Sequence, residues 1–112
     1  MRRLPDWRID VPNVILSKEA RKDIQAIRDY IRDDLSNPDA ARDMVKALRK
    51  TVSSLKQMPE RGVPLDTILS VHTEYRFLVC NNYRVFYLHD RDTVEVVRIL
   101  HTLQDYMRAL FL

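Results

Sequence analysis

The stretch that decides the fold is residues 75–88, YRFLVCNNYRVFYL, which TVEVVRIL follows at residues 93–100. Its two halves are rich in β-branched and aromatic residues, and Asn81 and Asn82 between them tolerate a positive φ. This pattern predicts a β-hairpin. Residues 93–100 are apolar on both faces, which is typical of a central strand. The chain therefore predicts an antiparallel meander with strands at 75–80, 83–88 and 93–100.

Two amphipathic helices are predicted before this meander. Ser17 is a good N-cap, and the apolar residues after it recur at spacings of three and four until Ser36. Asn37 and Pro38 are typical of a second helix start, and Pro59 ends that helix. Because about three residues join them, the helices should pack as an antiparallel hairpin. The predicted stripes are Ala20, Ile24, Ile27, Ile31 and Leu35, then Ala41, Val45, Leu48, Val52 and Leu55.

Shorter elements complete the predicted fold, which is α+β. An N-terminal strand is expected at Val14 to Leu16, and residues 59–74 are expected to form a loop with a short strand near Ile68. Thr102 and Asp105 have the spacing of a capping box, which predicts a short C-terminal helix. The whole prediction is an N-terminal strand, a two-helix hairpin packed on a three- to four-stranded antiparallel sheet, and that final helix. The predicted core contains Ile24, Ile27, Leu48, Val52, Val85, Val96 and Ile99.

Composition indicates a single domain of 112 residues, 46% of them hydrophobic. No apolar run approaches the roughly 20 residues that span a bilayer, and charges occupy residues 1–13, so a cytoplasmic location is expected. The single Cys80 and three scattered histidines predict neither an internal disulfide nor a metal site, and no cofactor is implied. The net charge of +3 permits an anionic partner. Five basic and two acidic residues in 38–58 place the surplus on the second helix.

The order of elements, with SKEARKDI at 17–24, YRFLVCNNYRVFYL at 75–88 and VEVVRILHTLQDY at 94–106, resembles the RelE/ParE toxin superfamily of bacterial type II toxin–antitoxin systems. Residues 1–12 are therefore interpreted as an N-terminal extension and residues 13–112 as the toxin domain. The resemblance implies one of two activities: cleavage of mRNA in the ribosomal A site, or poisoning of DNA gyrase. The implied partners are a cognate antitoxin and either the ribosome with mRNA or gyrase.

The same resemblance implies site residues for a metal-free nuclease that works by 2′-OH attack. His101, with an ordinary pKa of about 6.5, suits acid or base catalysis, and the planar guanidinium of Arg84 suits a phosphate. Tyr106 matches the final tyrosine of the superfamily pattern. These three residues are predicted to be catalytic, and His101 and the strand arginines could converge on one face of the sheet. RNA or phosphate binding is predicted for Arg76, Arg98, Lys46 and Arg49.

Structural explanations compete with these roles. Tyr106 belongs to an apolar stripe, the strand arginines could pair with Asp90, Asp92 or Glu95, and the basic helix could be a solvated face. His101 and Tyr106 near basic residues favour the nuclease, whereas a shortage of further acid–base residues favours a gyrase inhibitor. Many relatives carry arginine at the position of Leu103, so the nuclease could be weakened, or the chain could be an inactive relative that only binds its antitoxin.

Overall fold

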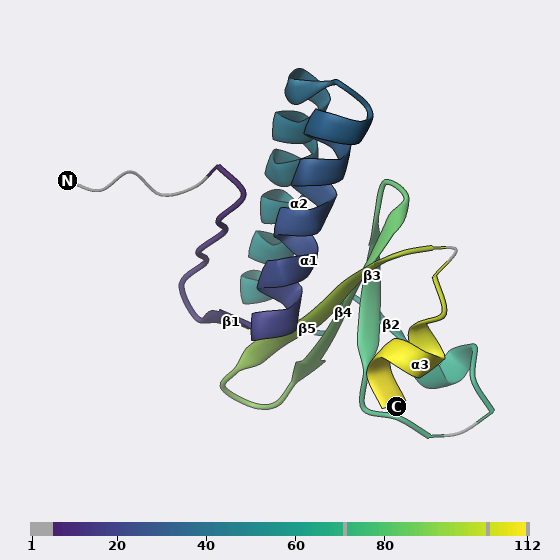
Figure 1. Ribbon diagram of the computed structural model, residues 1–112. Helices are drawn as coiled ribbons and strands as arrows, with labels where there is room; N and C mark the ends of the chain where they lie inside the picture. Colours follow the sequence, from purple (N-terminus) through teal and green to yellow (C-terminus); the bar gives the residue numbers. More distant parts are fainter. Residues whose placement is uncertain (1–5, 71, 103, 112) are drawn as a thin grey trace.

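The computed structural model describes residues 6–70, 72–102 and 104–111, and places a helical hairpin and a short final helix around a five-stranded sheet (Figure 1). The strand order is β1-β5-β4-β3-β2. In chain order the elements are β1 (Val14–Leu16), α1 (Lys18–Asp29), a π-helical turn (Tyr30–Asp34), α2 (Pro38–Gln57), β2 (Val63–Pro64), a 3-10 turn (Leu65–Thr67), β3 (Arg76–Cys80), β4 (Tyr83–His89), β5 (Val94–His101) and α3 (Tyr106–Phe111).

The sheet is mixed, so the prediction of three to four antiparallel strands is wrong in number and in direction. The meander β3-β4-β5 is antiparallel as predicted, and β5 lies between β4 and β1. However, β1 pairs with β5 in parallel, and the helical hairpin and strands between them provide the long connection that parallel strands require. The fifth strand, β2, has two residues and includes Pro64, so no alternation of apolar residues could reveal it.

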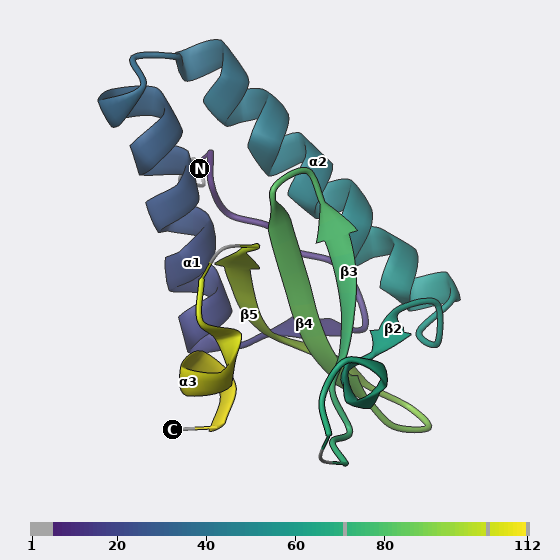
Figure 2. The same ribbon diagram turned by 90° about the vertical axis from the view of Figure 1, so that its right-hand side faces the viewer.

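The sheet separates two apolar cores (Figure 2). The helical hairpin covers one face, and α3 with the 3-10 turn lies over the other. All seven residues predicted for the core are buried. The predicted stripe of α2 is buried throughout, and that of the first helix is buried as far as Ile27. The second core, on the α3 face, consists of Leu65, Phe77, Phe86 and Leu100, with partly buried Tyr106 and Leu110 packed against it.

Both predicted N-caps of the helical hairpin are confirmed. The Ser17 side chain accepts a hydrogen bond from the backbone N–H of Ala20 at 3.0 Å, and Asn37 accepts one from Ala40 at 3.1 Å. The predicted end of the first helix is wrong, because the chain changes to a π-helical turn after Asp29. There the N–H of Leu35 bonds to the carbonyl of Tyr30, five residues earlier. The wider turn removes Leu35 from the buried stripe and leaves it 54% exposed.

The final helix begins later than predicted. The Asp105 carboxylate accepts a hydrogen bond from the N–H of Arg108 at 3.2 Å, so Asp105 is the capping residue. Thr102 is not the capping residue, because α3 begins only at Tyr106 and Asp105 directly precedes it. Leu103 lies outside the described residues. The predicted strand near Ile68 is also absent, since Ile68 ends the 3-10 turn.

Tyr87, in the central strand β4, forms hydrogen bonds with the loop that follows α2. Its hydroxyl donates to the carbonyl of Pro59 at 2.6 Å and accepts from the N–H of Gly62 at 2.9 Å. A Cβ atom on Gly62 would lie 2.5 Å from this oxygen, which explains glycine at this position. Burial raises the pKa of the Tyr87 phenol, although the Gly62 hydrogen bond opposes this effect.

Replacing Tyr87 by phenylalanine should lower the free energy of unfolding by about 1 to 3 kcal/mol, because the N–H of Gly62 and the carbonyl of Pro59 would lose their partner. Urea unfolding measures the change. The matched control is Tyr30→Phe, whose side chain is half exposed and which should be nearly neutral. Equal unfolding midpoints for Tyr87→Phe and the wild type would show that the two hydrogen bonds add no net stability.

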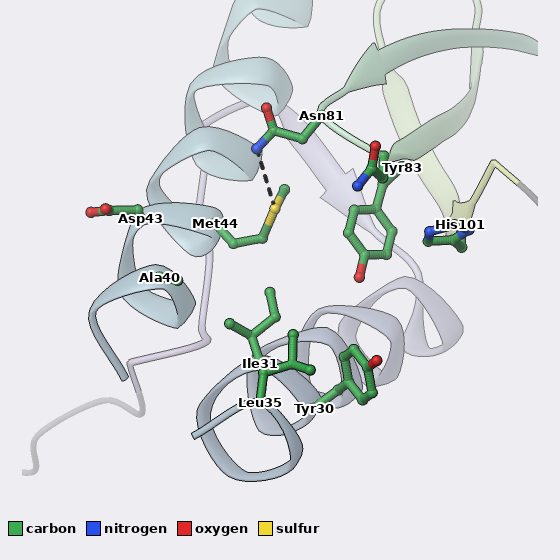
Figure 3. Close-up of a pocket in the computed structure, with 10 residues that line it drawn as sticks. Tyr30, Ile31, Leu35, Ala40, Asp43, Met44, Asn81, Tyr83 and His101 are labelled. Carbon is green, nitrogen blue, oxygen red and sulfur yellow. Dashed lines mark hydrogen bonds between the residues drawn. The ribbon is translucent and has the colours of Figure 1, made fainter. Parts of the chain in front are cut away.

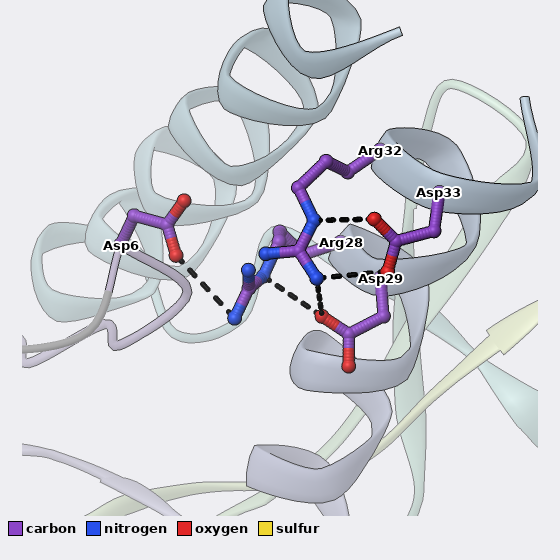
Figure 4. A network of polar contacts seen from close by, with 5 residues as sticks. All are labelled: Asp6, Arg28, Asp29, Arg32 and Asp33. Atoms are coloured by element: carbon purple, nitrogen blue, oxygen red, sulfur yellow. Dashed lines mark hydrogen bonds and ion pairs between the residues drawn. The ribbon is translucent and has the colours of Figure 1, made fainter. Parts of the chain in front are cut away.

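The segment before β1 packs on the outer side of the helical hairpin. Ile9 is buried in the core shared with the helices, and Asp6 lies 3.5 Å from the Arg28 guanidinium of α1 (Figure 4). Arg49 of α2 donates to the carbonyl of Arg8 at 3.4 Å. Contacts with both helices hold this segment, so residues 6–12 of the predicted extension are part of the folded structure. The boundary between an extension and a toxin domain at residue 12 stays a prediction.

Candidate functional site

The predicted catalytic residues lie on two different faces of the sheet. Tyr83 pairs with His101, and Arg84 pairs with Leu100. Because successive side chains of a strand point to opposite faces, Arg84 and His101 lie on opposite faces of the sheet. Tyr83 packs on the helix-side core, whereas Leu100 belongs to the α3-side core. The expected convergence on one face is therefore wrong. Arg84 shares the α3 face with Tyr106, and His101 lies with Tyr83 on the helix face.

A β-bulge in β5 explains this separation. Phe86 pairs with Arg98 and Tyr87 pairs with Val96, so Val97 has no partner of its own in β4. Because one extra residue reverses the alternation of side chains, Val96 and Ile99 both face the helices. His101, two residues after Ile99, follows the reversed alternation. Without the bulge, strict alternation from Val96 would place His101 on the α3 face.

On the α3 face, Arg84 is held between aromatic rings. Its guanidinium carbon lies 5.1 Å from the centroid of the Phe77 ring and 5.6 Å from that of Tyr106. The Nε atom of Arg84 is buried without a hydrogen-bond partner, and no acidic side chain of the described residues forms an ion pair with it. The predicted alternative of a salt bridge across the meander is therefore not formed in this part of the chain. The arrangement suits a planar anion, such as a carboxylate or a phosphate.

Tyr106 contributes to both the core and the Arg84 surroundings. Its ring lies 5.6 Å from that of Phe86, a buried residue of the α3-side core, and 5.6 Å from the Arg84 guanidinium carbon. Packing in the α3-side core is enough to explain an aromatic residue at this position without a catalytic role. His101 lies at the end of β5, and its imidazole makes an edge-to-face contact with Tyr83 at 5.5 Å. The imidazole does not lie at a helix N-terminus, because α3 begins only at Tyr106.

A cavity of about 730 Å³ opens on the helix face beside His101 (Figure 3). Three segments surround it: the π-helical turn after α1, the start of α2, and the turn between β3 and β4. Partial burial raises the pKa of the Tyr83 phenol, and nearby Tyr30 raises it further, so the Tyr83 hydroxyl is protonated at neutral pH. The lining residues are Tyr30, Ile31, Leu35, Ala40, Asp43, Met44, Asn81, Asn82, Tyr83 and His101.

Two of the predicted phosphate-binding arginines bind other parts of the protein. Arg98 forms a two-pronged ion pair with Asp23 of α1, at 2.8 and 3.0 Å, and the hydrogen bonds with Asp23 raise the pKa of Arg98. Arg76 donates to the carbonyls of Gly62 at 2.9 Å and Glu60 at 3.2 Å. A phosphate would have to displace these partners. Both arginines therefore have structural roles that the sequence pattern did not indicate.

Comparison with known proteins decides the family. The family model described as the ParE toxin of the type II toxin–antitoxin system parDE matches residues 14–106. The chain belongs to the ParE toxin family. Among solved structures, the "Chromosomal ParDE TA system from P. aeruginosa" superposes with a TM-score of 0.64 at 20% identity, covering 80% of this chain and 96% of that chain. At this identity the likeness shows a shared ParE-type fold. No curated protein matches the sequence significantly.

In this ParE-family chain the remaining predicted cations, Lys46 and Arg49, lie exposed on α2, where Arg49 also donates to the carbonyl of Arg8. Their proposed role in RNA binding stays a prediction. No helix among the described residues is both long and apolar enough to cross a membrane. Among the same residues, no group of three or more His, Cys, Asp or Glu side chains is placed to hold a metal ion.

Sequence reasoning missed most of the cavity at the tip of the ParE-type helical hairpin. Asn81 was interpreted only as a turn residue, and Leu35 only as the end of a buried stripe. The available signal was the closeness of two polar turns, at 36–37 and 81–82, in a fold where the helical hairpin lies on the meander. The alignment of the two tips depends on the packing angle, which a sequence pattern does not give.

Proposed function

We propose that this ParE-family toxin inhibits DNA gyrase and that a cognate antitoxin holds it inactive. The family match over residues 14–106 carries the proposal. The position of His101 supports it, since the acid–base candidate and the Arg84 guanidinium lie on opposite faces of the sheet. A gyrase inhibitor acts by binding and needs no acid–base pair around one phosphate.

The second candidate is a ribosome-dependent mRNA endoribonuclease, and one observation favours it. Arg84 carries a positive charge between the rings of Phe77 and Tyr106, without an acidic partner among the described residues. Such a group could bind a phosphate while a base stacks on a ring. A third candidate, an inactive relative that only binds its antitoxin, rests on Leu103, which lies outside the described residues.

Two assays on the same purified protein separate these candidates. In the first, gyrase supercoils relaxed plasmid in the presence of the toxin; in the second, ribosomes loaded with mRNA are incubated with it and the mRNA ends are mapped. The gyrase proposal expects loss of supercoiling and unchanged mRNA. New mRNA ends at the A site with normal supercoiling would replace it with the nuclease. No effect in either assay, with normal antitoxin binding, would indicate the inactive relative.

Arg84→Ala is expected to reduce growth inhibition by about ten- to a hundredfold, the equivalent of one lost charge-assisted contact of about 1.5 to 3 kcal/mol. The fold should persist, because no described residue depends on Arg84 for a hydrogen bond. Toxicity is measured by plating under induced expression, and folding by thermal melting. Arg91→Ala, at the exposed turn between β4 and β5, is the control. Full toxicity of a normally folded Arg84→Ala variant would remove Arg84 from the functional surface.

A further inference from the structure

A cleft of about 210 Å³ lies between the second half of α2 and the outer edge of β3, which Figure 2 shows beside each other. The space is large enough for a phosphate group, since one water takes about 30 Å³. Among the described residues, its lining contains two cations, two hydroxyl groups and two aliphatic side chains, but no carboxylate and no aromatic ring. The lining residues are Lys50, Thr51, Ser54, Arg61, Leu78 and Val79.

The two cations of the cleft are not neutralised. Lys50 and Arg61 are exposed, and neither forms a side-chain ion pair with a described residue. Glu60 is next to Arg61 in the chain but forms no ion pair with it. Arg98, by contrast, is held by Asp23 of α1. The cleft therefore carries two positive charges that are available to an anion.

Arg61 extends from a loop whose backbone is fixed by hydrogen bonds. Arg76 donates to the carbonyl of Glu60 at 3.2 Å and to that of Gly62 at 2.9 Å. These two residues flank Arg61, whose own N–H donates to the carbonyl of Met58 at 3.2 Å. The backbone that carries the Arg61 side chain is thus in place before a ligand arrives, which reduces the conformational entropy lost on binding.

The edge of β3 adds an unpaired backbone N–H to this cleft. The N–H of Leu65 donates to the carbonyl of Tyr75 at 2.9 Å, so residue 75 and every second residue after it direct their backbone groups toward β2. Val79 is the last residue of this series. The residue opposite Val79 in this register is Arg61, but β2 begins only at Val63. The N–H of Val79 therefore has no partner among the described residues and can donate to a ligand oxygen.

We propose that this cleft binds a phosphate group of a duplex DNA backbone. Lys50 and Arg61 supply charged donors, and the N–H of Val79 supplies a neutral one. Phosphate oxygens in protein–DNA complexes accept hydrogen bonds from lysine, arginine and backbone N–H groups. Lys46, one helical turn before Lys50, continues the positive surface toward a neighbouring phosphate. The toxin holds DNA here by its backbone and does not read its sequence.

The lining of the cleft favours duplex DNA over a single strand. Proteins that bind single strands offer aromatic side chains on which bases stack, and none of the described lining residues is aromatic. A duplex keeps its bases stacked inside and presents its phosphates outside. The choice of DNA over duplex RNA rests on the proposed inhibition of gyrase, whose substrate is duplex DNA. Binding in the cleft places the toxin on the gyrase–DNA complex rather than on gyrase alone.

The test measures binding of the purified toxin to a fluorescent DNA duplex of about 20 base pairs, by anisotropy at salt concentrations from about 50 to 200 mM. Lys50→Gln and Arg61→Gln each remove one phosphate contact, so each should weaken binding about tenfold at the lowest salt and reduce the salt slope by about 0.9. The matched controls are Lys22→Gln on α1 and Arg91→Gln at the β4–β5 turn, which remove the same charge from exposed positions outside the cleft. Each control should change the Kd less than about twofold and leave the slope unchanged.

Thermal melting verifies the fold of every variant before its affinity is compared. Equal losses for the cleft variants and their controls would show that net charge alone attracts DNA, and would overturn the proposal. Tighter binding of a single-stranded RNA of the same sequence would overturn it too. A supercoiling assay on the same samples separates the cleft from the target. A toxin that inhibits gyrase without binding duplex DNA would contradict only the cleft, whereas binding through the cleft by a toxin that never inhibits gyrase would support the cleft and contradict only the proposed target.

Discussion

Asp23→Ala is expected to lower the free energy of unfolding by about 3 kcal/mol. Asp23 accepts two hydrogen bonds from the Arg98 guanidinium and a third from the backbone N–H of Ile99 at 2.9 Å. Removal of the carboxylate leaves a largely buried cation and a backbone donor without partners, a change that costs about 3 to 5 kcal/mol in buried pairs. The lower end applies here because the Arg98 side chain remains 24% exposed.

Urea unfolding measures this loss, and a second substitution identifies its cause. The double variant Asp23→Ala with Arg98→Met should recover part of the stability, because no unpaired charge remains beside α1. Asp23→Asn should fall between the wild type and Asp23→Ala, since its amide oxygen can still accept from Ile99. A loss below about half a kcal/mol for Asp23→Ala would show that water replaces the carboxylate without cost.

Ile27→Ala should lower the free energy of unfolding by about 2 to 5 kcal/mol, through lost burial and the cavity left behind. Ile27 is buried in the core between α1 and the sheet, among large aliphatic side chains that cannot all move into the space. Its control is Ile15→Ala in β1, where the side chain is half exposed and the change should be small. A guanidinium chloride titration that places both variants within about half a kcal/mol of the wild type would contradict the assigned packing.

The sequence predicted secondary structure best where a regular pattern of apolar residues continues over many positions. The three strands of the meander and the stripe of α2 each extend over five or more residues, and the structure confirms them; the first stripe is confirmed as far as Ile27. The pairing of β1 with β5 could not be predicted, because β1 has three residues and its partner lies about 80 positions later. The π-helical turn was hidden for another reason. Tyr30–Asp34 follows an α-helix without a proline or glycine to mark the change.

The roles of the predicted site residues stay predictions, and their expected convergence on one face of the sheet is wrong. Arg84 and Tyr106 do lie together, as their proposed roles require. His101 was assigned to the same place from the resemblance to the toxin superfamily, which does not give the register of β5. The unpaired Val97 reverses the alternation of side chains in that strand, and nothing in the run VEVVRILH distinguishes a bulged strand from a regular one. A change of one residue in register moves a catalytic candidate to the other side of the molecule.

The bulge also lies where α1 is attached to the sheet. Ser17 at the start of α1 donates its backbone N–H to the carbonyl of Val96 and its hydroxyl to the carbonyl of Val97, while Asp23 accepts from Ile99. These hydrogen bonds attach the first two turns of α1 to β5, at the end of the helix opposite the π-helical turn. Sliding or tilting of α1 would break these bonds together. The helical hairpin is therefore anchored to the sheet through the start of α1, at the part of β5 that contains the bulge.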